Sequence, residues 1–249
     1  MLSAGIIAWI GAVFLTAGFV KGVVGMGLPT VAMGLLAVTM RPPQAAALLL
    51  IPSLVTNLWQ LLTGPSFGGL CKRLWPMMAG IVLGTVAGAG LLTGAHTGVA
   101  SAGLGAALVL YALVGLAKAG FITLARQEVW ASPLVGVATG LVTGATGVFV
   151  IPAVPYLQSL RLEKEDLIQA LGLSFTVSTA ALAIGLFRTG ALASQTAQMA
   201  GSVLALAPAL AGMFAGLALR QKMSVETFRK VFFAGLLALG VYLVGEALR

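Results

Sequence analysis

Long apolar stretches separated by short polar turns fill almost the whole chain. A helix that crosses a bilayer needs about 20 mostly apolar residues; eight of the stretches are of that order and two are too short. The pattern predicts an all-α integral membrane protein with about ten hydrophobic segments, eight long and two short or re-entrant. The segments are Ile6–Met26, Leu28–Met40, Ala45–Leu62, Leu74–Leu92, Val99–Ala117, Pro133–Val148, Val150–Leu160, Leu167–Phe187, Thr196–Leu219 and Val231–Ala247.

The two short segments, Leu28–Met40 and Val150–Leu160, occupy corresponding places in the two halves of the chain. Each follows a glycine-rich stretch and has a proline near its start, which suits the first turn of a new helix. The preceding stretches, Gly18–Gly25 and Gly140–Gly147, share the pattern G-x-V-x-G-x-x-G at an offset of 122 residues. This order of features predicts an internal repeat.

We expect two five-segment repeats, residues 1–125 and 126–249, which together form one transmembrane domain. An odd number of segments per repeat makes the second repeat inverted relative to the first. The basic residues support this count, because it places ten of them on one face and three on the other, and basic loops are typically cytoplasmic. The expected cytoplasmic residues are Lys72, Arg73, Lys118, Arg126, Arg161, Lys164, Arg220, Lys222, Arg229 and Lys230. Arg41, Arg188 and Arg249 lie on the other face, so both termini are predicted to be periplasmic.

The composition supports a membrane protein, since 59% of the residues are hydrophobic, 8% are charged and the mean hydropathy is +1.07. A soluble domain would have about a quarter of its residues charged. The net charge of +8 comes from short basic pairs that are not clustered with aromatic residues, so no nucleic-acid partner is expected. The expected partners are membrane lipids and a small anionic substrate, and a homodimer is compatible with the sequence.

The distribution of titratable residues argues against several kinds of chemistry. Proton pumps and many cation-coupled transporters use carboxylates at membrane depth, whereas all six here lie in or next to predicted loops or termini. His96 is the only histidine and Cys71, placed in a predicted loop, is the only cysteine, so neither a metal site nor another cofactor is expected. We therefore expect a protein that is not an enzyme. The carboxylates are Glu128, Glu163, Glu165, Asp166, Glu226 and Glu246.

Lys21 is the one charged residue inside the first long apolar segment. A cation at membrane depth costs several kcal/mol unless it is paired or lines a water-filled cavity. Either its long side chain snorkels to the interface, or it faces a pathway for anions. A break beside it at Gly25 and Gly27, before Thr30, would free backbone N–H groups that can bind an anion.

The second half supplies a matching cluster, in which Thr143 aligns with Lys21. Two broken helices that face each other across an inverted repeat commonly form the substrate site of a secondary transporter. Alternatively, the glycines serve close packing and the hydroxyls serve hydrogen bonding between helices. The candidate substrate-binding residues are Lys21, Gly22, Gly25, Gly27, Thr30, Asn57, Gln60, Thr143, Gly144, Thr146, Gly147, Ser174 and Ser178.

Three stretches of the first half carry a family resemblance: Gly-Phe-Val-Lys-Gly-Val-Val-Gly-Met-Gly-Leu-Pro from Gly18, Pro43-Gln-Ala-Ala-Ala, and Asn57-Leu-Trp-Gln60. Together with the corresponding stretch of the second half, residues 140–186, they make the chain similar to the sulfite exporter TauE/SafE family. The resemblance implies a bacterial inner-membrane permease of two repeats that moves sulfite, sulfonates or related anions, typically outward. The sequence departs from the family after Gly147, where Val148-Phe149-Val150 stands in place of further glycines.

These observations favour an exporter of small sulfur-containing anions that works by alternating access, with its site at the two glycine-rich breaks. Two alternatives stay open. An anion channel would use the same residues, and a membrane scaffold subunit would use the glycines for helix packing alone.

Overall fold

The computed structural model describes residues 4–94, 97–117, 127–220, 222 and 224–248, and within these ranges it is helical without strands. In this described part, eight helices are long and apolar enough to cross a membrane, and each overlaps one of the eight long predicted segments. They are α1 Ala4–Val24, α3 Pro42–Leu62, α4 Phe67–Thr93, α5 Thr97–Leu116, α7 Glu128–Thr146, α9 Lys164–Arg188, α11 Thr196–Leu219 and α12 Val225–Ala247.

Two short helices, α2 (Leu28–Ala37) and α8 (Ala153–Ser159), form where the two short segments were predicted. Each follows a break that depends on glycine, because Gly27 (φ 105°) and Gly147 (φ 71°) adopt left-handed backbone angles that residues with a Cβ rarely adopt. A third short helix, α10 (Ala191–Ser194), was not anticipated from the sequence.

Several helices begin earlier than the apolar pattern indicated. α4 starts at Phe67 rather than Leu74, so the prediction that Cys71 lies in a loop is wrong. Likewise α12 starts at Val225 rather than Val231. Hydropathy detects only the part of a helix that lies in hydrocarbon, whereas the backbone stays helical through the charged turn beyond it. His96 lies outside the described residues.

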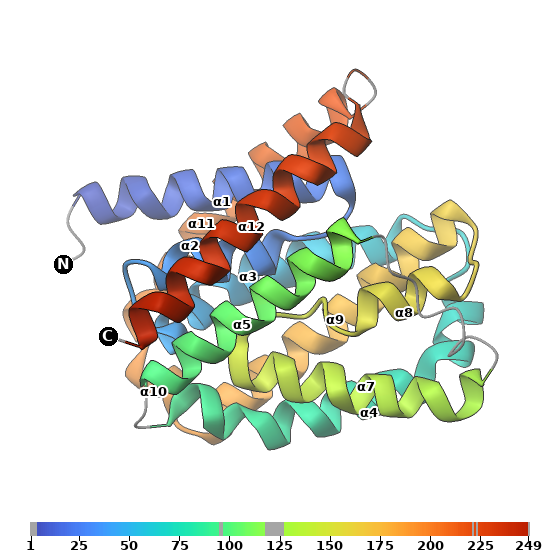
Figure 1. Ribbon diagram of the computed structural model, residues 1–249, viewed down its shortest axis with the longest axis horizontal. Helices are drawn as coiled ribbons and strands as arrows, with labels where there is room; N and C mark the ends of the chain where they lie inside the picture. The colour runs from blue at the N-terminus through green and yellow to red at the C-terminus, as the bar shows by residue number, and fades with distance from the viewer. Residues whose placement is uncertain (1–3, 95–96, 118–126, 221, 223, 249) are drawn as a thin grey trace.

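The long helices run roughly along one direction, which is horizontal in Figure 1. α1 begins and α12 ends at the left-hand end of the bundle, together with the α2–α3 turn and the end of α9 (Figure 1). The starts of α4, α9 and α12 lie at the right-hand end, and with them the described residues of the predicted cytoplasmic set. Lys118, Arg126 and Arg249 lie outside the described residues.

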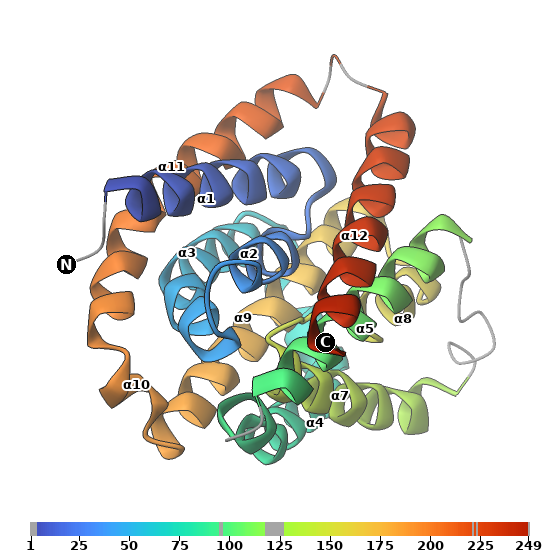
Figure 2. The same ribbon diagram turned by 60° about the vertical axis from the view of Figure 1, so that its left-hand side comes forward.

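Helices from the two halves of the chain pair with one another (Figure 2). α1 packs on α11, α4 on α7, and α5 on α12, while α3 packs on α9 at the centre. The buried share of the apolar window is 67% in α3 and in α9 but only 28% in α12. Among the eight spanning helices, α3 and α9 are therefore the most enclosed, and they carry Asn57, Gln60, Ser174 and Ser178 of the predicted site.

Candidate functional site

Lys21 and Asn57 meet inside the bundle. The Lys21 side chain is 3% exposed, so it does not reach the surface, and its Nζ donates a hydrogen bond to Asn57 Oδ1. That amide is its only acceptor among the described residues. Asn57 Nδ2 donates in turn to Thr179 Oγ1 at 3.4 Å. Side chains of α1, α3 and α9 therefore join around one buried ammonium group.

Gln60 holds the first helix break next to this group. Its Nε2 donates to Gly25 O at 2.9 Å and to Ile168 O at 2.8 Å, linking the break to α3 and α9. Gly25 has φ 82° and Gly27 φ 105°. Because a carbonyl that leaves a helix must find another donor when it is buried, the Gln60 amide stabilises the interruption of the chain. Three predicted residues, Gly25, Asn57 and Gln60, thus lie close to Lys21.

Two further polar residues of α9, one amide and one hydroxyl, bond to α3 or to the turn after it and were not among the predicted site residues. Gln169 Nε2 donates to Leu61 O at 2.7 Å, and the Ser66 N–H donates to Gln169 Oε1 at 2.8 Å. Thr179 accepts from Asn57. Both residues could have been found in the sequence, since each is a polar residue within the apolar segment Leu167–Phe187.

The polar groups of the second break bond to their own backbone. Thr143 Oγ1 donates to Thr139 O at 2.8 Å and to Val148 O at 3.3 Å. Thr146 Oγ1 donates to Val142 O at 2.7 Å and accepts from the Val148 N–H at 3.2 Å. No hydrogen bond among the described side chains links Thr143 or Thr146 to Lys21 or Asn57. Hydrogen bonds thus join Lys21 to Asn57 and Gly25 to Gln60 at the first break, whereas Thr143 and Thr146 bond within their own segment.

Three predicted glycines lie against neighbouring helices. A Cβ added to Gly22 would come within 2.2 Å of Met213 O on α11, and one added to Gly144 within 2.4 Å of Thr85 O on α4. Gly147 packs on the side chain of Met33, the nearest atom 2.8 Å from where its Cβ would be. Their contacts are those of closely packed helices, which membrane proteins commonly build on small residues.

Several buried hydroxyls have no hydrogen-bond partner among the described residues. They include Ser174 and Ser178 of α9, Ser53 of α3 and Thr30 of α2. Neighbouring threonines differ, because Thr56, Thr176 and Thr179 each donate to a carbonyl one turn back. A buried hydroxyl without a partner costs about 1–3 kcal/mol. Ser53, Ser174 and Ser178 therefore keep an unused donor, whereas those threonines already use their protons.

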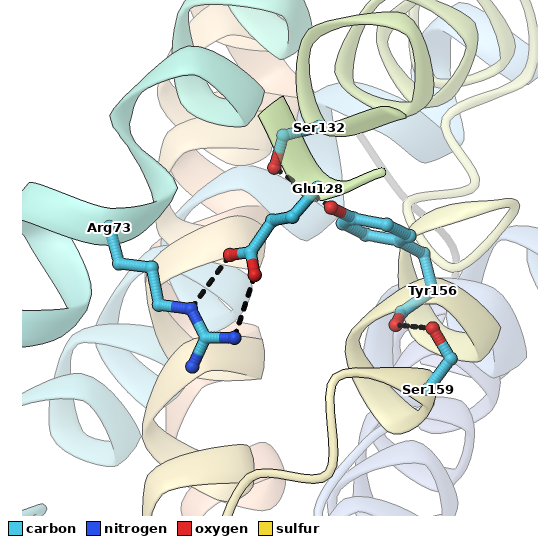
Figure 3. A network of polar contacts seen from close by, with 5 residues as sticks. All are labelled: Arg73, Glu128, Ser132, Tyr156 and Ser159. Atoms are coloured by element: carbon cyan, nitrogen blue, oxygen red, sulfur yellow. Dashed lines mark hydrogen bonds and ion pairs between the residues drawn. The ribbon is translucent and has the colours of Figure 1, made fainter. Parts of the chain in front are cut away.

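A separate network at the other end of α7 ties three helices together (Figure 3). Arg73 of α4 forms a bidentate ion pair with Glu128 of α7 at 2.7 and 2.8 Å. Ser132 Oγ lies 3.0 Å from the hydroxyl of Tyr156 on α8, and Ser159 Oγ donates to Tyr156 O at 2.6 Å. The network fixes α8 against α7.

Similarity to known proteins comes from a family model. No curated protein and no solved structure matches the chain. A family model described as "Sulfite exporter TauE/SafE" matches residues 10–243, nearly the whole chain. With its eight helices of membrane-spanning length in the described part, the chain therefore belongs to the sulfite exporter TauE/SafE family, a family of membrane transporters.

Proposed function

We propose that the protein exports a small sulfur-containing anion, such as sulfite or an organosulfonate, which binds beside Lys21. The observation that carries this proposal is a buried ammonium group whose only acceptor among the described residues is the neutral amide of Asn57. A buried charge without a counter-ion is strongly unfavourable. An anion supplies that counter-ion, and a single lysine with neutral donors holds it weakly enough for release.

The free hydroxyls give this site further donors. Sulfite and sulfonate oxygens accept several hydrogen bonds, and Ser53, Ser174 and Ser178 are fully buried donors without partners among the described residues. All three belong to α3 or α9, the helices that Asn57 and Thr179 join. We assign the threonines of the second break to a different role, that of stabilising the interruption between α7 and α8.

Alternating access between two inverted repeats is the mechanism we propose. Equivalent glycines in the two halves support the repeat, because a Cβ on Gly18 or Gly22 would lie 2.1 or 2.2 Å from a carbonyl oxygen of α11. A Cβ on Gly140 or Gly144 would lie 2.3 or 2.4 Å from a carbonyl oxygen of α4. α1 also runs in the opposite direction to α7 in Figure 1, as an inverted repeat requires.

The charge distribution favours an orientation in the bacterial inner membrane with both termini in the periplasm. The end of the bundle that holds Lys72, Arg73, Arg161 and Lys164 would then face the cytoplasm. In this orientation the membrane potential drives anions outward, by about 2.3 kcal/mol per charge per 100 mV. Export would therefore proceed without a buried carboxylate for cation coupling.

Flux of radiolabelled sulfite and taurine in proteoliposomes tests the proposal at imposed membrane potentials. Lys21→Met should lower flux about 100-fold, because a hydrogen bond to a charged group contributes up to about 3 kcal/mol. Lys72→Met, which removes an exposed lysine, is the matched control and should transport normally. Saturable exchange between preloaded anions supports a carrier, whereas flux that does not saturate would indicate a channel. Absence of flux for every anion would contradict transport and favour the scaffold alternative.

A further inference from the structure

A polar cavity lies at the opposite end of α3 from Asn57. It has a volume of about 360 Å³ and is enclosed by the start of α3, the ends of α4 and α9, and α10. Its lining residues are Arg41, Pro43, Gln44, Thr93, Gly94, Thr189, Gly190, Ala191, Ser194 and Gln195. Cavities of this size commonly hold small ligands. We call it the Arg41 cavity.

The electrostatics of the Arg41 cavity favour an anion. Arg41 is the only charged residue that lines it among the described residues. Arg41 also lines a neighbouring cavity, in which Glu246 is the other charged lining residue. The carbonyl-bearing ends of α4 and α9 would repel an anion, but nearby hydroxyls donate to their carbonyls. Thr93 Oγ1 donates to Ala89 O at 3.1 Å, and Thr189 Oγ1 donates to Gly185 O at 3.2 Å.

Available donors in the cavity suit an oxyanion. No hydrogen bond from the Arg41 guanidinium to a described residue is seen, and this group can bind two oxygens of one anion at once. Gln44 uses its Oε1 to accept from the Arg41 N–H at 3.1 Å, which leaves its Nε2 to donate. The side chain of Gln195 also lines the cavity without a described partner.

The Arg41 cavity is connected to the buried lysine by the same two helices. Asn57 is 16 residues after Arg41, which corresponds to about 24 Å along α3 at the rise of an α-helix. Ser53 lies on α3 between them, and its buried hydroxyl has no partner among the described residues. On α9, Thr179 bonds to Asn57 and the cavity-lining Thr189 follows the end of the same helix, so α3 and α9 both extend from one site to the other.

We propose that the Arg41 cavity is a second binding site for the transported sulfur oxyanion, at the end of the bundle where the anion is released. This proposal rests on the proposed function, because it assigns both sites to one pathway. The site lies at the end that holds the start of α1 and the end of α12 (Figure 1), and binding there holds the anion after it leaves Lys21. In this proposal Arg41 lines the opening of the transport pathway on the side of release.

Flux from each side of the membrane tests this proposal. In oriented membrane vesicles, Arg41→Gln should raise the half-saturating sulfite concentration at the Arg41 end by about 10-fold or more, as expected for a lost charge-assisted bond. The half-saturating concentration measured at the other end should change by less than about twofold. Arg41→Lys should give a half-saturating concentration at the Arg41 end between those of the wild type and Arg41→Gln. Arg188→Gln is the matched control, because Arg188 is an exposed arginine at the same end that does not line the cavity.

Equal effects of Arg41→Gln and Arg188→Gln would overturn the proposal, since they would indicate a general surface field. Equilibrium binding of labelled sulfite to detergent-solubilised Lys21→Met protein gives a second readout that does not depend on flux. Residual binding that is lost on adding Arg41→Gln supports a second site, and residual binding that is insensitive to Arg41→Gln, or no residual binding, contradicts it. If the wild-type protein neither transports nor binds sulfite or taurine, the proposed function fails and this proposal fails with it.

Discussion

The two helix breaks have related sequences but different chemistry. At the first break, Lys21 is buried with one neutral acceptor, and Gln60 reaches across from α3 to satisfy Gly25 O. At the second break, Thr143 and Thr146 satisfy the backbone of their own segment. Two helix interruptions can therefore both depend on a left-handed glycine while only one of them carries a buried charge.

Placing a carboxylate beside Lys21 should have the largest effect on transport, because it supplies the counter-ion that the first break otherwise lacks. In Asn57→Asp the new carboxylate pairs with the lysine and takes the place that we assign to the anion. We expect flux to fall about 100-fold, as for loss of a charged hydrogen bond, while the melting temperature in detergent is unchanged or higher. Asn57→Ser, which keeps a neutral acceptor, should lose less activity. Normal flux in Asn57→Asp would contradict contact between Lys21 and the anion.

Glycine substitutions should show that the two regions are equivalent in packing. Gly18→Ala and Gly140→Ala each force a Cβ to within 2.1 and 2.3 Å of a carbonyl oxygen. Each should destabilise the protein by about 1–3 kcal/mol, as overpacking does. Thermal unfolding in detergent measures this, with Gly11→Ala as control because no atom lies within 4 Å of its added Cβ. Unequal losses at Gly18 and Gly140 would weaken the case for a structural repeat.

Removing a free serine hydroxyl should weaken anion binding while the stability of the unliganded protein is unchanged or higher, because a buried hydroxyl without a partner is itself unfavourable. Ser174→Ala or Ser178→Ala should raise the half-saturating sulfite concentration about 5-fold, which corresponds to one hydrogen bond of about 1 kcal/mol. Thr176→Val is the control, since that hydroxyl already donates to Gly172 O at 2.7 Å. Equal changes in all three variants would mean that the serines do not contact the anion.

The smallest effect is expected at the second break. Thr143→Val removes the donor to Val148 O and should destabilise the protein by about 1 kcal/mol, with flux within about twofold of wild type. Thr143→Ser retains the hydroxyl and should restore stability. A large loss of flux at unchanged stability in Thr143→Val would place the second break in contact with the anion and would remove the contrast between the two regions.

Much of the architecture could be predicted from periodicity and composition. The eight long segments all became helices of membrane-spanning length, because a backbone in lipid has to satisfy its own hydrogen bonds. The breaks at Gly27 and Gly147 were also predicted, since glycines followed by proline disfavour a continuous helix. Helix starts such as Phe67 were missed, because charged turns outside the hydrocarbon carry no apolar pattern.

The sequence by itself determined that this is a helical membrane protein, that Lys21 is its exceptional charge and that the chain is related to sulfur-anion exporters. Only the tertiary structure decided which polar residues meet. Lys21 and Asn57 are 36 residues apart, and Gln60 and Ile168 are 108 apart. Such contacts depend on how helices cross and rotate against each other, which is set by packing of side chains across the whole bundle. The same packing left the hydroxyls of Ser174 and Ser178 without partners among the described residues, while Thr143 bonded to its own chain.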